Sequence, residues 1–170
     1  MTLNDEVRSH AEEVHHIAEF VDRARTGMLT TMTESSKHVS RPMAVQEVEF
    51  DGDLWFFCYD DSAKATQIRS QPEVNVSFAN DKQSDWTSLS GKAEIVYDRQ
   101  RAERLWSTPL KVWFPDGLDT KGLSLIKVHV ESAEYWESSS SKVRQLIGAA
   151  HAAANGDPDK FPATNRSVEL

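Results

Sequence analysis

Three polar residues near one short predicted helix have the chemistry to bind an anion. Ser62 and Lys64 begin the segment 62–71, where free backbone N–H groups, the helix dipole, a hydroxyl and an ammonium group can converge. Arg41 opens a strand that we expect to pair with residues 54–58 across an Asp51-Gly52 turn, which would bring its guanidinium to the same end of the sheet. A phosphate or carboxylate bound there would gain charge-assisted hydrogen bonds of roughly 1.5–3 kcal/mol each.

Composition alone favours a simpler interpretation of the same residues. The segment 62–71 is also typical of an ordinary helix with Asp61 or Ser62 as its N-cap, ended by Gln71-Pro72. Lys64 would then be solvated and would bind nothing. The two interpretations differ in whether the three polar groups share a ligand, and the residue types leave both open.

The histidines and the cysteine do not indicate a second site. His10 and His15 are five residues apart, whereas zinc-binding pairs on a helix prefer a spacing of four, so a solvated helix face is the better interpretation and no metal site is predicted. Cys58 lies within the apolar run 54–59 and is expected to be a small core residue. Trp113 and Trp136 are candidates for stacking on a planar ligand, although tryptophans mostly fill cores and interfaces.

The apolar pattern changes from helical to strand-like along the chain. Apolar residues at steps of three and four predict an amphipathic helix over 4–25, stopped by Gly27. Gly91 is expected at a bulge or a close approach within a strand. The other predicted segments are strands at 27–33, 42–50, 54–59, 74–79, 87–98 and 123–137, helices at 62–71, from 98 and at 141–153, an aromatic loop at 110–117 and a disordered tail at 154–170. Strands interrupted only by short helices favour an antiparallel barrel over a doubly wound parallel sheet.

Length and composition suit one domain with its own core. The chain has 170 residues, 39% of them apolar, and we place the domain at 1–153. No apolar stretch is long enough to span a membrane and the N-terminus lacks the features of a secretory signal, so a cytoplasmic protein is expected. The net charge of −8 opposes binding to nucleic acid.

Six segments in order resemble the pyridoxamine 5'-phosphate oxidase-like superfamily of FMN-binding split barrels, and above all its general stress protein branch. They are GMLTTM, SRPMAVQ, LWFFCYDDSAKATQIRSQPEVNVSFA, SGKAEIVYDRQRAERLW, VWFPDG and AEYWE, and they span about residues 10–145. The resemblance implies a mainly β fold, a split β-barrel of antiparallel Greek-key type with flanking helices. It also implies a homodimer that holds FMN, or FAD, at sites formed between the two subunits.

The resemblance also implies flavin contacts for particular residues of this chain. Arg41 would lie near the ribityl phosphate, Ser62 and Lys64 at the phosphate itself, and Trp136 would approach the ring in the other subunit's site. The strand along the flavin would include Pro42 and Met43, and Phe57 and Cys58 occupy positions where the family has an aromatic residue and a threonine. Trp113, a candidate for stacking, completes the predicted cofactor site.

Some positions depart from the oxidases of this superfamily. Ala63 stands where those enzymes have a phosphate-binding arginine, and Gln46 stands where they have the lysine that binds the substrate phosphate. A true pyridoxamine 5'-phosphate oxidase is therefore not expected. The sequence leaves open an FMN-dependent oxidoreductase of the general stress type, a flavin-binding or sequestering protein without turnover, and a split barrel that has lost its cofactor.

Overall fold

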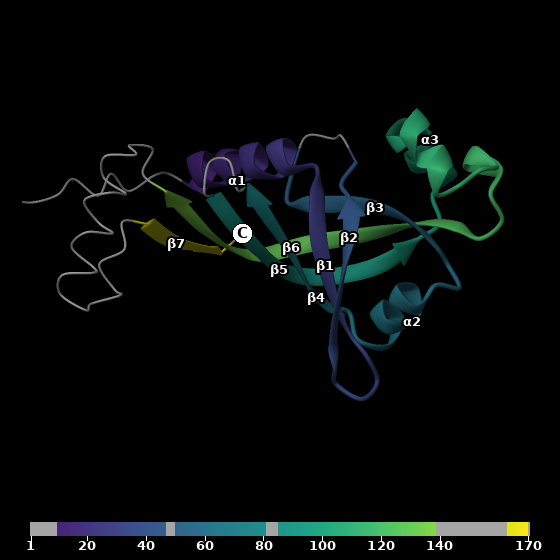
Figure 1. Ribbon diagram of the computed structural model, residues 1–170, viewed down its shortest axis with the longest axis horizontal. Helices are drawn as coiled ribbons and strands as arrows, with labels where there is room; N and C mark the ends of the chain where they lie inside the picture. Colours follow the sequence, from purple (N-terminus) through teal and green to yellow (C-terminus); the bar gives the residue numbers. More distant parts are fainter. Residues whose placement is uncertain (1–9, 47–49, 81–84, 139–162, 170) are drawn as a thin grey trace, which may run out of the picture.

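The computed structural model describes residues 10–46, 50–80, 85–138 and 163–169 (Figure 1). Its elements are the helices α1 (His10–Ala24), α2 (Ala63–Ser70) and α3 (Arg99–Leu105), the 3-10 helices η1 (Thr108–Val112) and η2 (Gly117–Asp119), and the strands β1 (Thr26–Met32), β2 (His38–Ala44), β3 (Asp53–Tyr59), β4 (Glu73–Asn80), β5 (Asp85–Val96), β6 (Leu123–Ser138) and β7 (Ala163–Glu169). None of these helices is long and apolar enough to cross a membrane.

The described strands form one antiparallel sheet. Their order is β2-β1-β4-β5-β6-β3, and β7 pairs with the last part of β6. Just beyond β2, the N–H of Gln46 donates to the carbonyl of Trp55 in β3 (3.1 Å), so the two ends of the strand order approach each other. The sheet curls in this way without closing completely. This confirms the predicted mainly β fold of the antiparallel, Greek-key split-barrel type.

Helix α1 covers one side of the sheet and completes the main core (Figure 1). Its side chains Ile17, Phe20 and Val21 are buried against the strands. The main core consists of the buried residues Ile17, Phe20, Val21, Leu29, Phe50, Leu54, Phe56, Cys58, Ile68, Val74, Val76, Phe78, Leu89, Ala93, Ile126, Val128, Val130, Ala133, Tyr135 and Val168. Helix α2 contributes Ile68, which fixes this helix to the sheet.

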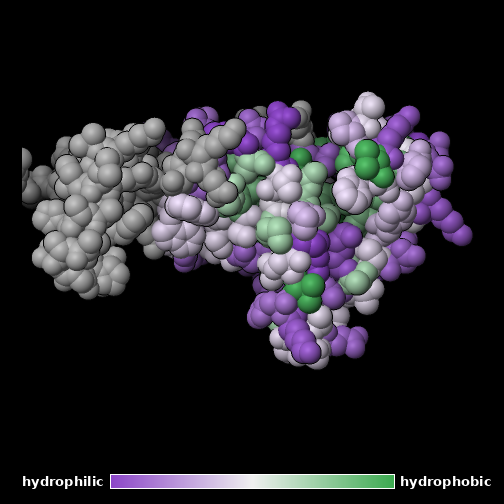
Figure 2. Space-filling model, viewed as in Figure 1, coloured by the Kyte–Doolittle hydropathy of each residue, from purple (hydrophilic) through white to green (hydrophobic). Residues whose placement is uncertain are grey.

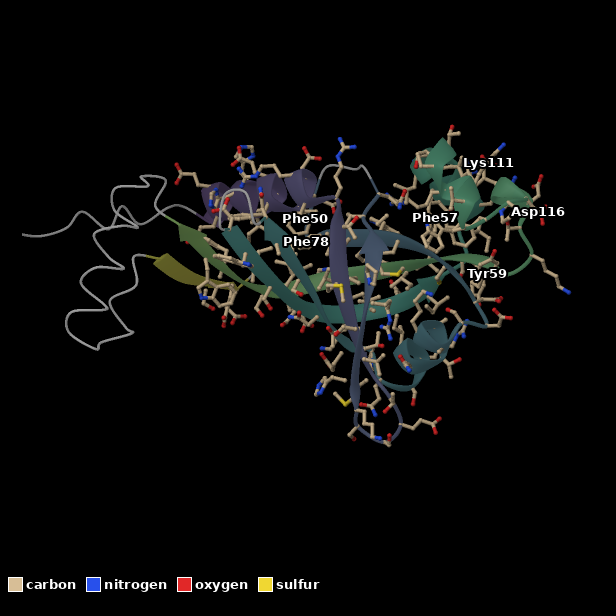
Figure 3. The ribbon with its side chains drawn as sticks, viewed as in Figure 1. Phe50, Phe57, Tyr59, Phe78, Lys111 and Asp116 are labelled. Atoms are coloured by element: carbon tan, nitrogen blue, oxygen red, sulfur yellow. The ribbon has the colours of Figure 1, made fainter. Side chains whose placement is uncertain are left out.

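A second apolar cluster lies on the other face of β3. It consists of the buried residues Trp55, Phe57, Ala102, Leu105, Leu110, Phe114 and Leu125. Figure 3 shows Phe57 and Tyr59 at the end of the molecule that carries α3, with Lys111 and Asp116 beyond them. Alternate residues of β3 therefore enter two different apolar clusters, which explains why nearly every residue of this strand is apolar.

A bulge in β6 changes which of its residues face the main core. Gly91 of β5 pairs with Val130, whereas the residue before Gly91 pairs with position 132, so Glu131 is an extra residue in β6. Even-numbered positions 126–130 enter the main core before the bulge, and odd-numbered ones, including Tyr135, enter it afterwards. A Cβ atom on Gly91 would lie 2.0 Å from the carbonyl oxygen of His129. The bulge or close approach predicted at Gly91 is confirmed.

The predicted hairpin across Asp51-Gly52 is present in the described residues only as one bond across the turn, from the N–H of Gln46 to the carbonyl of Trp55, and residues 47–49 lie outside the described residues. β2 pairs with β1, with Arg41 opposite Leu29, and β3 pairs with β6. The turn itself is present, because Gly52 has a φ of 102° and the N–H of Asp53 donates to the Asp51 carboxylate (3.2 Å). An Asp-Gly turn reverses the chain but does not select the partner of the next strand.

The first helix ends within one residue of the predicted end at residue 25, but Gly27 is not the residue that stops it. α1 ends at Ala24, and Arg25 takes the left-handed conformation (φ 55°) that often follows a helix. Gly27 instead lies within β1, where a Cβ atom would come within 2.8 Å of the side chains of Phe78 and Val76. The glycine is therefore required by close packing in the sheet. The predicted residues 4–9 of this helix lie outside the described residues.

The predicted disorder of the tail 154–170 is wrong for residues 163–169, which form β7. This strand pairs with β6 in antiparallel register, and Val168 is 4% exposed in the main core. The polar composition of the tail gave no strand pattern. Residues 154–162 and the predicted helix at 141–153 lie outside the described residues.

The two short helices begin where their capping residues predict. Ser62 is extended (φ −68°, ψ 151°) immediately before α2, and Gln71 ends that helix. The Asp98 carboxylate accepts a hydrogen bond from the N–H of Arg101 (2.9 Å) and so caps α3. The predicted aromatic loop at 110–117 includes the second half of η1 and the first residue of η2.

Candidate functional site

The first turn of α2 has backbone N–H groups that the side chain of its N-cap residue, Ser62, does not bind. The hydroxyl of Ser62 donates to the carbonyl of Tyr59 (2.6 Å), and its side chain makes no capping bond to the helix. The first N–H groups of α2 are therefore not capped by Ser62. Lys64 in the same turn is half-buried and forms no ion pair with any residue in the described part of the chain. The helix dipole and this cation both favour a negative ligand.

Arg41 approaches the same helix from the sheet. Its Nη1 donates to the carbonyl of Leu29 (3.2 Å) and to Oγ1 of Thr31 (2.6 Å), and its Nη2 donates to Oε1 of Gln67 (3.2 Å). Burial lowers the pKa of the Arg41 guanidinium, yet an arginine in a protein stays charged. Arg41 is therefore a cation anchored between β1, β2 and α2.

Gln67 connects Arg41 with the predicted phosphate-binding turn. It follows Lys64 by three residues, so the two side chains lie on one face of α2, about 4.5 Å apart along the helix axis. The structure thus brings Arg41 to the helix that begins with Ser62 and Lys64. It does so through pairing of β2 with β1 and not through the predicted hairpin.

Phe57 and Cys58 lie in the interior of the protein, on opposite faces of β3. Phe57 is 5% exposed and its ring packs against Trp106 and Phe114, with centroids 5.5 and 6.1 Å away. Cys58 is 1% exposed, as the core interpretation predicts, and its Sγ lies 3.3 Å from Oγ of Ser124. Burial raises the pKa of the Cys58 thiol, which keeps it protonated. A flavin contact by either side chain stays a prediction.

Pro42 and Met43 follow Arg41 along β2. Pro42 is exposed and pairs with Met28, and Met43 is half-buried against the main core, opposite Gly27. Among the strands that the structure describes, β2 lies at one end of the pairing order. A proline is tolerated there because it has no N–H to contribute. One edge of this strand is therefore available to a flat ligand.

Trp113 lies beside the loop that leads into α2. The hydroxyl of Tyr59 donates to the carbonyl of Trp113 (2.9 Å), and Tyr59 is three residues before Ser62. The Trp113 side chain is 71% exposed, whereas the adjacent Phe114 is buried. Trp113 is thus close to the side chain of Tyr59, and a contact with a flavin stays a prediction.

Trp136 lies far from α2 within one chain. The first residue of β6, Leu123, pairs with Tyr59 next to α2. From position 123 to 136 the strand runs about 40 Å at 3.3 Å per residue, and Figure 1 shows it crossing the molecule between these two ends. Trp136 is opposite Trp86 of β5 and is half-buried. Trp136 is therefore far along β6 from the start of α2. The pairing registers place Arg41 in the row of Ala133, four strands away from β6, so one chain does not bring Trp136 to Arg41 either.

The site predicted from the sequence did not include Thr31 and Gln67. Thr31 is 1% exposed, and its hydroxyl donates to Oε1 of Gln67 (2.6 Å) while accepting from Arg41. The spacing of Gln67 from Lys64 on a predicted helix is a signal that would have identified this glutamine. Nothing in the sequence indicates Thr31, because the pairing of β1 with β2 is not a local property.

Comparisons with known proteins agree with this fold. Protein bli-3 of Neurospora crassa is 29% identical over 157 residues, which cover 86% of this chain and 75% of that protein. The crystal structure of general stress protein 26 from Bacillus anthracis str. Sterne has a TM-score of 0.65 at 26% identity and covers 75% of this chain and 94% of its own. The general stress FMN/FAD binding protein from Xanthomonas citri has a TM-score of 0.67 at 24% identity, covering 77% and 92%.

A family match covers most of the chain. Residues 12–159 match the family described as pyridoxamine 5'-phosphate oxidase like. This range contains Arg41, α2 and Trp136, so it includes both separated parts of the candidate site. The chain therefore belongs to the pyridoxamine 5'-phosphate oxidase-like family and is similar to its general stress proteins.

Proposed function

We propose that this protein binds a flavin, FMN or FAD, non-covalently, with the flavin phosphate at the first turn of α2. The observation that carries the proposal is the anchoring of the Arg41 guanidinium on Gln67, one helical turn from Lys64. A helix N-terminus with one cation in its first turn, Lys64, and a second cation bound to the helix from β2, Arg41, suits a phosphate dianion on a chain whose net charge is −8. The FMN/FAD binding named for the Xanthomonas citri neighbour supports the same ligand.

We propose further that the complete site forms between two copies of the chain. The long separation of Trp136 from α2 supports this, because a second copy is the simplest source of a tryptophan for the flavin ring. Large side chains left exposed also suit an interface; they are Met28, Val39, Trp86, Tyr97, Val112 and Trp113. On the face shown in Figure 2, apolar residues appear in small groups separated by hydrophilic ones.

The residues of this chain would bind and orient the flavin. Arg41, Lys64 and the N–H groups of α2 would neutralise the phosphate, and the open edge of β2 would lie along the ring system. A bound flavin supplies redox chemistry through its ring, and nearby dipoles and charges adjust its potential. The protein's contribution is thus placement and electrostatics, which is compatible with an oxidoreductase of the general stress type.

A flavin-binding protein without turnover is the second candidate, and Gln46 favours it. This residue replaces the substrate-binding lysine expected of an oxidase, is 5% exposed and donates through Nε2 to the carbonyl of Ala44 (3.0 Å). A side chain buried in this way does not reach a substrate. Oxidation of NADH or NADPH by the flavin-loaded protein in the presence of oxygen distinguishes the two candidates, since a binder without turnover leaves the rate at that of free FMN.

Titration with FMN tests the shared part of both candidates. Quenching of tryptophan fluorescence should reveal saturable binding, and Lys64→Ala should raise the Kd for FMN about tenfold, as expected for one charge-assisted contact. Lys37→Ala is the matched control, because Lys37 is an exposed lysine in the turn between β1 and β2. A wild-type protein that binds no FMN at high micromolar concentration would refute the proposal.

A further inference from the structure

Arg41, Thr31 and Gln67 form a closed triangle of hydrogen bonds. Nη1 of Arg41 donates to Oγ1 of Thr31 (2.6 Å), Nη2 donates to Oε1 of Gln67 (3.2 Å), and the Thr31 hydroxyl donates to the same Oε1 (2.6 Å). The two oxygens that accept from Arg41, Oγ1 of Thr31 and Oε1 of Gln67, are thus 2.6 Å apart. This spacing matches the end of a guanidinium, where the two Nη groups stand side by side.

The triangle leaves one edge of Arg41 without an acceptor. A guanidinium has five N–H donors, and Nη1 uses both of its own, on Thr31 and on the carbonyl of Leu29. One Nη2 donor is used on Gln67. The Nε–H and the second Nη2–H have no acceptor in the described part of the chain. These two donors are parallel and lie on the same edge, which is the arrangement that binds two oxygens of a phosphate at once.

The orientation of the Gln67 amide is fixed by its surroundings. A guanidinium donates only, so the amide oxygen and not the NH₂ group must face Arg41. Thr31 is 1% exposed, so its hydroxyl has no access to water as an alternative partner, and Arg41 and Gln67 set its orientation. The three residues come from β1, β2 and α2, so the network also sets the position of the helix relative to the sheet.

We propose that Thr31 and Gln67 are positioning residues, which hold the end of the Arg41 guanidinium so that its Nε–Nη2 edge binds the flavin phosphate. This inference rests on the proposed function and adds to it the orientation of one cation. Neither Thr31 nor Gln67 would touch the flavin. Their effect should therefore appear only with ligands that carry a phosphate.

The test compares FMN with riboflavin, which has the same ring system but no phosphate. The measured quantity is the phosphate selectivity, defined as the Kd for riboflavin divided by the Kd for FMN. Gln67→Met keeps the length of the side chain but removes the acceptor, so it should lower the phosphate selectivity about tenfold and leave the Kd for riboflavin unchanged. A merely structural role would raise both Kd values together.

Gln71→Met is the matched control. Gln71 lies four residues further along the same chain segment, and its Nε2 donates to the carbonyl of Thr33 (3.3 Å) without contacting Arg41. The control removes a hydrogen bond between the end of α2 and the sheet, and it should leave the phosphate selectivity at the wild-type value.

Two further variants keep the test decisive if Gln67→Met does not fold. Thr31→Val removes the buried hydroxyl with little change in shape and should lower the selectivity in the same direction. Gln67→Glu places a carboxylate against Arg41, which would compete with the phosphate for the guanidinium and reduce the selectivity furthest.

The outcomes separate this inference from the proposed function. Unchanged selectivity in the folded variants, a parallel rise of both Kd values, or a wild-type protein that does not prefer FMN to riboflavin would each overturn the positioning role while flavin binding stands. A wild-type protein that binds neither flavin would overturn the proposed function, and the positioning role with it.

Discussion

Replacing Gly91 by alanine should destabilise the sheet where β5 and β6 meet at the bulge. The new Cβ atom would lie 2.0 Å from the carbonyl oxygen of His129 and 2.9 Å from Cα of Val130. Both neighbours are backbone atoms in a strand that pairs on two sides, so no side-chain rotation relieves the collision. The two strands must separate locally and lose hydrogen bonds of the ladder.

The expected magnitude follows from these contacts. Overpacking usually costs about 1–3 kcal/mol, and a collision with backbone belongs at the upper end of that range, near 3 kcal/mol. For a chain of this size each kcal/mol lowers the melting temperature by about 2–4 °C. Gly91→Ala should therefore melt about 6–12 °C below the wild type, as followed by far-UV circular dichroism.

Gly52→Ala is the control for the loss of glycine itself. Gly52 has a φ of 102°, and no atom lies within 4 Å of the position that a Cβ would take, so alanine there meets conformational strain and no collision. That strain should cost about 1–2 kcal/mol. If Gly91→Ala melted no lower than Gly52→Ala, the close approach of β5 and β6 at the bulge would not cause the loss of stability that we expect from the collision.

Two further predictions concern the C-terminal strand and the cysteine. Val168→Asp places a charge in the main core and should cost at least about 2 kcal/mol in urea unfolding, whereas the exposed Ser167→Asp should be nearly neutral; equal losses would contradict burial of β7. Burial raises the pKa of the Cys58 thiol, so the folded state holds this proton more tightly than the unfolded state does. The contribution of this difference to the free energy of unfolding is complete at pH 7 and is lost as the pH rises through the folded pKa. Cys58→Ala should therefore lose less stability than the wild type between pH 7 and pH 10, and identical losses would argue against a buried thiol.

Local signals in the sequence predicted the local features of the fold. Ser62 and Gln71 mark the limits of α2, Asp98 caps α3, and Gly91 marks the bulge, because each of these depends on residues close in the chain. The periodicity of residues 123–137 likewise predicted the long strand β6.

The partners of the strands were beyond the reach of local signals. Asp51-Gly52 indicated a hairpin, but the pairing of β3 with β6, which comes much later in the chain, is not a local property and no turn signal indicates it. The contacts of Arg41 with α2 depend likewise on long-range pairing. The sequence therefore indicated Arg41, Ser62 and Lys64 as candidates, whereas Thr31 and Gln67 became visible once the strands were paired.

The position of β7 has a consequence for the solubility of shortened forms of this protein. β3 and β7 follow one another along the same side of β6, because β3 pairs with the first half of β6 and β7 pairs with Ser132–Ser138 in the second half. Without residues 163–169, the unpaired N–H and C=O groups of that second half would form a ready template for strands of other molecules. Residues 163–169 thus cover this edge of β6 and should hinder aggregation by strand addition.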